Sequence, residues 1–406
     1  MISVEDAKRI VLEQAVPLGI EQVKLSASVG RVLAQDLIAQ TDLPPFDNSA
    51  MDGYALWSTD TEHATKDHPV QLRLVGEVAA GQALERAVSR GEAVKMMTGA
   101  PLPPGANSVV MLEEARLREG MVEIFNPILP GRHVRKAGED IKTGEMALKA
   151  GTQVGLTHLG LLAGLGQAAV PVFRLPSVAV LATGSELVAI DQPLAPGKIR
   201  NSNSPTLVAL LRRLGIRPTD YGVVVDDRAL IHQRLEEAAV HDVILISGGV
   251  SVGAHDLVKT VLREMGMETL FWRVNMKPGK PLLFGRLRKS VVFGLPGNPI
   301  SCVVCFLEFI APYVRKVTGE ADPTHGLVHA RLTQSLRKKE PKTLLLTAQL
   351  REEAGSLVVT PTPQQGSGML SSLAQANAFI VVPEDIMELE AGSLVEVVPL
   401  GGDQWL

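Results

Sequence analysis

The sequence has few cysteines, and they do not form a disulfide or metal-binding pattern. Cys302 and Cys305, the only 2 cysteines, lie within the apolar segment PISCVVCFLEF. A helix would place both on one side, where we expect them to be small buried hydrophobic residues. A redox pair would need a thioredoxin-like setting, and one pair cannot supply the four ligands of a zinc site. So few cysteines suit a reducing compartment, and we expect a cytoplasmic protein.

The sequence also lacks an excess of either charge and lacks a long hydrophobic run. Lys and Arg total 40 against 44 Asp and Glu, a net charge of −4 at pH 7. This balance argues against a nucleic-acid partner, and any anion site must be built locally. No window of about 18 residues is apolar and uncharged enough to cross a membrane. The N-terminal segment predicts a helix capped by Ser3 rather than a signal peptide, so we expect no membrane partner.

The hydrophobic patterns predict several domains of different class. Residues 41–144 contain short alternating runs such as QLRLVGEV, separated by turns such as GAPLPPGA, which is typical of a β-rich domain. Residues 173–322 alternate buried strands with helices of about ten residues, which favours a doubly wound, mostly parallel sheet. After residue 323, spaced strands such as TLLLTAQL predict a small sandwich or barrel. The remaining segments predict a strand at GRVLAQDLIAQ and a Gly-rich crossing element near residues 145–172.

Four Gly- or Asp-containing loops follow strands of the predicted parallel sheet: ATGSELV, VVVDDR, SGGVSVGAHD and GLPGNPIS. Ligands of doubly wound sheets bind at the carboxyl ends of the strands. Glycine lets backbone N–H groups approach an anion, and a helix N-terminus favours phosphate. The chain contains neither a GxxxxGK[ST] nor a GxGxxG motif, so the loops indicate an anion site of another kind.

Acidic residues on three of these loops indicate a cation. Glu186, Asp226 and Asp256 would come together at one sheet edge, and acids around a phosphate need a cation such as Mg²⁺ between them. Helix capping explains Glu186 or Asp227 taken singly equally well. Lys277 and Lys280 of KPGKP could bind phosphate or another oxyanion, although a solvated turn is the alternative.

Six motifs together resemble the molybdopterin molybdenumtransferase family, which belongs to molybdenum cofactor biosynthesis and is related to the E domain of gephyrin. The resemblance covers essentially the whole chain, and the motifs occur in the family's order: FDNSAMDGYA (46–55), MTGAPLPPGA (97–106), GEDI (138–141), SGGVSVG (247–253), KPGKP (277–281) and GLPGNP (294–299).

The resemblance implies a multidomain α/β protein that forms a homodimer. Its central α/β domain would be molybdopterin-binding-like, consist of residues 1–19 plus 173–322, and contain the doubly wound, mostly parallel sheet. An elongated linking domain (20–40 plus 145–172), a β-rich domain (41–144) and a C-terminal β-barrel (323–406) would complete the subunit. The active site is expected between the α/β domain of one subunit and the β-rich domain of its partner.

The resemblance implies hydrolysis of adenylylated molybdopterin with insertion of molybdate and release of AMP, assisted by Mg²⁺. The catalytic residues carried over are Asp52, Thr98, Asp140, Glu186, Asp226 and Asp256, with the last three as metal ligands. The substrate-binding residues are Ser247, Gly248, Gly249, Ser251, Gly253, Arg273, Lys277, Lys280, Pro296, Gly297, Asn298, Pro299, Ser301 and Ser367.

Two positions depart from the family pattern. Arg273 stands where the family commonly has lysine, and TLLLTAQL (343–350) lacks an arginine expected near molybdate, for which Arg351 is the nearest substitute. Two other functions stay open: adenylylation of molybdopterin, and a non-catalytic molybdopterin-binding scaffold. A molybdopterin adenylyltransferase is a candidate upstream partner.

Overall fold

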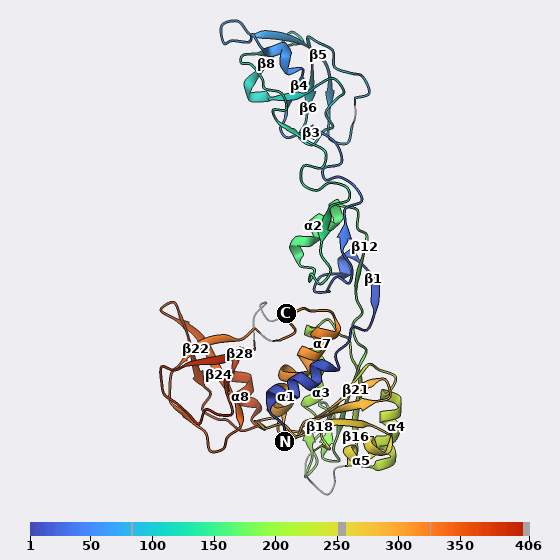
Figure 1. Cartoon of the computed structure of the whole chain (residues 1–406), viewed down its shortest axis with the longest axis vertical. Helices are drawn as coiled ribbons and strands as arrows, with labels where there is room; N and C mark the ends of the chain where they lie inside the picture. Colours follow the sequence, from blue (N-terminus) through green and yellow to red (C-terminus); the bar gives the residue numbers. More distant parts are fainter. Residues whose placement is uncertain (83, 251–256, 325, 401–406) are drawn as a thin grey trace. The chain divides into compact units, whose positions relative to one another are not determined.

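The computed structural model describes residues 1–82, 84–250, 257–324 and 326–400. Contacts divide the chain into two compact units (Figure 1). Unit 1 consists of Met1–Val23, Gly30–Ala34 and Pro171–Leu406, and unit 2 of Lys24–Val29 and Gln35–Val170. The finer, four-part division expected from the sequence stays a prediction.

A six-stranded sheet forms the centre of unit 1. Its order is β16 (Thr219–Val224), β13 (Val178–Thr183), β17 (Val243–Ser247), β21 (Ser290–Leu295), β20 (Leu283–Leu287) and β18 (Glu268–Trp272). The first four strands pair in parallel, while β20 is antiparallel to both of its neighbours. Every residue of β13, β17 and β21 is buried, as expected for strands covered on both faces. The predicted mostly parallel sheet is confirmed.

Helices cover both faces of this sheet (Figure 1). One core cluster joins it to α1 (Val4–Glu13), α3 (Asn203–Arg213), α6 (Pro299–Cys305) and α7 (Ala311–Val317). The other joins it to α4 (Arg228–Ala238) and α5 (Leu257–Glu264). A π-helical turn, Phe306–Ile310, connects α6 to α7. The arrangement is doubly wound, because helices pack on both sides of the sheet.

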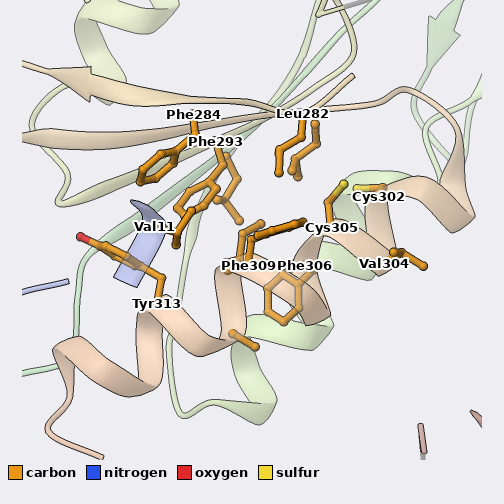
Figure 2. Close-up of a cluster of buried hydrophobic side chains, with 14 of the residues drawn as sticks. Val11, Leu282, Phe284, Phe293, Cys302, Val304, Cys305, Phe306, Phe309 and Tyr313 are labelled. Atoms are coloured by element: carbon orange, nitrogen blue, oxygen red, sulfur yellow. The ribbon is translucent and has the colours of Figure 1, made fainter. Parts of the chain in front are cut away.

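The first cluster explains the two cysteines. Figure 2 shows Cys302 and Cys305 on the helix that packs below Phe284 and Phe293 of the sheet. Burial raises the pKa of the Cys302 thiol to about 12, and burial also raises that of Cys305. Both therefore stay protonated, and they are free and buried, as the sequence predicted.

The C-terminal part of unit 1 is a closed barrel. Its strands are β24 (Thr343–Glu353), β25 (Ser356–Pro361), β22 (Val328–Leu332), β28 (Leu394–Pro399) and β26 (Ala378–Val382), and β26 pairs back to β24. Closure removes both sheet edges and decides between the sandwich and the barrel. The short β19 (Met276–Lys277) pairs with the start of β24, and α8 (Leu370–Gln375) also contacts β24.

Unit 2 contains the predicted β-rich part. Its six-stranded sheet runs β7 (Ser108–Met111), β4 (Gly53–Leu56), β6 (Glu92–Met96), β5 (Val70–Val78), β9 (Met121–Ile124) and β8 (Ala115–Arg118). The crossing element contains a helix, α2 (Leu156–Gly164). In the described residues no helix is both long and apolar enough to span a membrane.

The predicted strand at GRVLAQDLIAQ is wrong for most of its length. The segment forms only bridge residues at Val32 and Leu33, the latter opposite Val172, and the two-residue β2 (Leu37–Ile38), which pairs with β11 (Met146–Leu148). Its alternating apolar residues lack a continuous neighbouring strand, so pattern alone did not produce a strand.

Candidate active site

In unit 2, Asp52 and Thr98 come together. The Oδ1 atom of Asp52 accepts hydrogen bonds from the backbone N–H and from the hydroxyl of Thr98, both at 2.7 Å. They meet because Asp52 precedes β4 and Thr98 follows the adjacent, antiparallel β6. These bonds, the backbone one first, lower the pKa of the Asp52 carboxyl. Asp140 is exposed, and its backbone N–H donates to the Leu43 carbonyl at 3.1 Å.

In unit 1, the parallel strands end at a cavity of about 840 Å³, here called the loop cavity. It lies where the sequence predicted a ligand, at the carboxyl ends of the strands. Of the predicted site residues, it is lined by Glu186, Asp226, Ser247, Gly248, Gly249, Pro296, Gly297, Asn298 and Pro299. Ser251, Gly253 and Asp256 lie outside the described residues.

Asp226 is held by the neighbouring loop. Its Oδ2 atom accepts from the backbone N–H of Ser185 at 2.8 Å, and the Ser185 hydroxyl accepts from the backbone N–H of Asp226 at 3.0 Å. Within the described part of the chain, no hydrogen bond engages Oδ1 of Asp226. The first bond orients the carboxylate and leaves Oδ1 for a ligand, and the second fixes the backbone of Asp226 against Ser185.

Glu186 and Asp226 fit a magnesium site in part. Both carboxylates line the loop cavity, and Mg²⁺ prefers oxygen ligands of this kind. Among the described residues no group of 3 or more His, Cys, Asp or Glu side chains could hold a metal ion. Mg²⁺ is usually bound through one or two carboxylates plus substrate phosphate, and Glu186 and Asp226 are the carboxylates that would serve in that mode.

The third loop needs glycine where it turns beneath the cavity. Gly248 has φ of 94°, and a Cβ placed there would lie 2.4 Å from the carbonyl oxygen of Thr183. Only glycine fits both conditions. The Thr183 hydroxyl lies buried under this loop and has no hydrogen-bond partner within the described residues. At Gly248 and Gly249 the loop therefore lines the cavity with backbone atoms that no side chain covers.

Asn203 connects the third and fourth loops and was missed in the sequence. Its Nδ2 atom donates to the hydroxyl of Ser247 and to the carbonyl of Gly297, both at 2.7 Å. Asn203 begins α3 and lines the loop cavity. The signal that could have found it is the polar run RNSNSPT directly before this helix.

A second cavity, of about 420 Å³ and here called the lysine cavity, lies between KPGKP, the start of α6 and the barrel strand β24. Lys277, Lys280 and Lys342 line it, together with the polar residues Asn298, Ser301, Thr347, Gln365 and Ser367. The two cavities share Pro281 and Asn298. The Nδ2 atom of Asn298 donates to the Ser367 hydroxyl at 3.0 Å, which fixes a barrel loop beside α6.

The two arginines singled out in the sequence lie elsewhere. Arg273 is not among the described residues that line either cavity, and its guanidinium carbon lies 3.9 Å from the centroid of the Trp272 ring. Arg351 lies farther along β24 and donates to the Gln349 side chain. Where β24 lines the lysine cavity it contributes Leu344, Leu345, Leu346 and Thr347.

Known families match the chain in three consecutive parts. The MoeA N-terminal region (domain I and II) matches residues 2–166, a probable molybdopterin binding domain matches residues 179–316, and the MoeA C-terminal region (domain IV) matches residues 329–400.

Individual proteins also match this chain over nearly its whole length. The chain is 34% identical over 412 residues to a molybdopterin molybdenumtransferase of Bacillus subtilis (strain 168), with 100% of this chain and 96% of the relative covered. A protein of the same name from Staphylococcus epidermidis is 32% identical over 398 residues, covering 98% of this chain and 95% of the relative. A crystal structure of the molybdopterin biosynthesis MoeA protein of Pyrococcus horikoshii matches 99% of this chain and 100% of that chain, with a TM-score of 0.86 at 33% identity. The chain therefore belongs to the MoeA family.

Proposed function

We propose that this protein is a molybdopterin molybdenumtransferase, which inserts molybdate into adenylylated molybdopterin and releases AMP. The observation that carries the proposal is the pair of adjoining cavities. One has carboxylates and a glycine loop, and the other has three lysines. The phosphoanhydride of the substrate and a free oxyanion would thus bind side by side, because Pro281 and Asn298 line both cavities.

The loop cavity suits the adenylyl phosphate. Backbone groups of Gly248 and Gly249 can approach phosphate oxygens closely, because no Cβ stands in the way. Glu186 and Asp226 would hold Mg²⁺, with Asp256 as the proposed third ligand. When bound, the metal neutralises the charge that develops on the leaving phosphate oxygens. Asn203 fixes the positions of the third and fourth loops relative to each other, because its side chain donates hydrogen bonds to both.

The lysine cavity suits molybdate. This tetrahedral dianion resembles sulfate, and charge-assisted hydrogen bonds from Lys277 and Lys280 would bind its oxygens. The hydroxyls of Ser301 and Ser367 add neutral donors at the same cavity. Molybdate would then lie beside molybdopterin while its adenylyl group occupies the loop cavity.

The proposal includes a homodimer in the cytoplasm. Asp52, Thr98 and Asp140 belong to unit 2, whereas both cavities belong to unit 1. We propose that unit 2 of a second copy completes each site, as the family resemblance implies. An adenylyltransferase acting on molybdopterin would supply the substrate.

The test is AMP release from adenylylated molybdopterin with Mg²⁺ present, measured against molybdate concentration. We expect release that rises with molybdate and saturates. Folded protein that releases no AMP contradicts the transferase and favours a scaffold, to which the apolar stretch of β24 also lends support. Formation of adenylylated molybdopterin from ATP and molybdopterin would instead assign the preceding reaction.

A further inference from the structure

The lysine cavity collects positive charge from two separate segments. Lys277 and Lys280 come from KPGKP, and Lys342 comes from the residues just before β24. No Asp or Glu is among the described residues that line the cavity. The leucines of β24 cannot bind an anion, and among the described residues that line the cavity from the barrel, Lys342 is the only cationic one.

The backbone at Lys342 is held in place from two directions. The buried Lys338 ammonium donates to the Lys342 carbonyl at 2.9 Å, and also to the carbonyls of Pro383 and Glu384 at 2.5 and 3.0 Å. On the other side, the next residue, Thr343, pairs with Met276 of β19 and donates its N–H to the Asn275 carbonyl at 3.1 Å. Lys342 is therefore anchored next to the strand that carries Lys277.

The Lys342 side chain is already paired with an acid outside the cavity. Its ammonium bonds the Glu340 carboxylate, and the two side chains are 21% and 63% exposed. The hydrogen bond from Lys342 is the largest cause that lowers the pKa of Glu340, and the charges of Lys277 and Lys280 act in the same direction. Glu340 thus lies within the field of all three lysines and stays ionised.

We propose that Lys342 is the third cationic ligand of the oxyanion, and that the oxyanion displaces the Glu340 carboxylate to reach it. This inference rests on the proposed function of the lysine cavity. A dianion can compete with the Glu340 carboxylate, because Glu340 is largely exposed and an ion pair that water reaches contributes little stability. Lys342 would then add the cation on the barrel side of the lysine cavity.

The experiment is calorimetric titration of the full-length protein with sodium molybdate, at fixed ionic strength and with Mg²⁺. We expect Lys342→Met to weaken molybdate binding by about tenfold or more, as for loss of a charged hydrogen bond. Lys342→Arg should retain binding, because it keeps the charge and the donors. Glu340→Gln should strengthen binding, because the competing carboxylate is gone.

Lys339→Met is the matched control. Lys339 is exposed, near Lys342 in sequence, and not among the described residues that line either cavity. Equal affinities of Lys342→Met and Lys339→Met would overturn the role of Lys342, and unchanged affinity of Glu340→Gln would overturn that of Glu340. In both cases molybdate-dependent AMP release by the unaltered protein would leave the proposed function standing. Failure of the unaltered protein to bind molybdate would reject the oxyanion cavity and this inference together.

Discussion

Two adjacent aspartates show how much a single residue depends on its contacts. Asp226 lines the loop cavity and is oriented by Ser185. Asp227 caps α4 instead, because its Oδ1 atom accepts from the backbone N–H of Leu230 at 2.9 Å. From the sequence, Asp227 could equally well cap a helix or belong to the functional site. The structure assigns it to capping.

Replacing Asp226 with asparagine should lower the rate of AMP release by about a hundredfold or more, since the side chain loses its charge. Binding of adenylylated molybdopterin should largely remain, because the amide can still accept the Ser185 N–H. Single-turnover AMP release and equilibrium binding would be measured on the same preparation.

Asp227→Asn is the control for this substitution. Asparagine caps helices as well as aspartate does, so turnover and stability should both stay close to those of the unaltered protein. Unchanged turnover of Asp226→Asn would remove Asp226 from the catalytic residues.

At the scale of elements, one carboxylate joins the segments that lead into β13 and β17. Asp242 accepts hydrogen bonds from the Arg174 guanidinium at 3.0 Å, from the Ser177 N–H at 2.8 Å and from the Ser177 hydroxyl at 2.7 Å. Burial by itself would raise the pKa of this carboxyl, but the bonds from Arg174 and Ser177 outweigh it and lower the pKa to about 2. The Asp242 carboxylate therefore ties the start of β13 to the start of β17.

This anchor should weaken in acid. A carboxyl whose pKa is lower in the folded protein stabilises the fold at every pH above its unfolded pKa. For Asp242 this stabilisation is lost as the pH falls from about 4 to about 2. Asp242→Asn should lower the free energy of unfolding at neutral pH by roughly 1–2 kcal/mol, allowing for the partly exposed Arg174. The measurement is denaturant unfolding at several pH values. The unaltered protein should lose more stability than the variant over this pH range, and parallel curves would contradict the assignment.

At the scale of the whole molecule, the predicted catalytic residues divide between the two units. Asp52, Thr98 and Asp140 lie in unit 2, and Glu186 and Asp226 lie in unit 1. If each active site combines unit 1 of one subunit with unit 2 of another, two inactive variants should complement each other.

We expect Asp52→Asn and Asp226→Asn to be inactive separately and to regain part of the activity as a mixed dimer. One of the two sites in that dimer would carry both substitutions, and the other would carry neither. The measurement is AMP release by dimers purified through two different affinity tags.

A mixed dimer of Asp52→Asn with Asp140→Asn is the matched control. Both substitutions lie in unit 2, so each site would keep one defect and activity should stay lost. A mixed dimer of Asp52→Asn and Asp226→Asn with no recovered activity would contradict a site shared between subunits.

Much of the fold could be read from local patterns. The runs VAVLAT and VILIS became the buried strands β13 and β17, and Ser3 caps α1 by accepting from the Asp6 N–H. Hydrophobic period, caps and turn residues are local properties, so they are visible in the chain itself. The segment GRVLAQDLIAQ failed because a strand also needs a partner strand, which no local pattern supplies.

The sequence by itself determined the classes of the domains and, through its motifs, the loops that surround the loop cavity. Only the tertiary structure decided which side chains on those loops share a cavity. Lys342 joins Lys277 because a short strand pairing brings their segments together, and Asn203 reaches Ser247 and Gly297 because α3 begins beside both loops. Such contacts depend on side-chain direction and on the pairing of distant segments, which are properties of the packed chain and not of its local pattern.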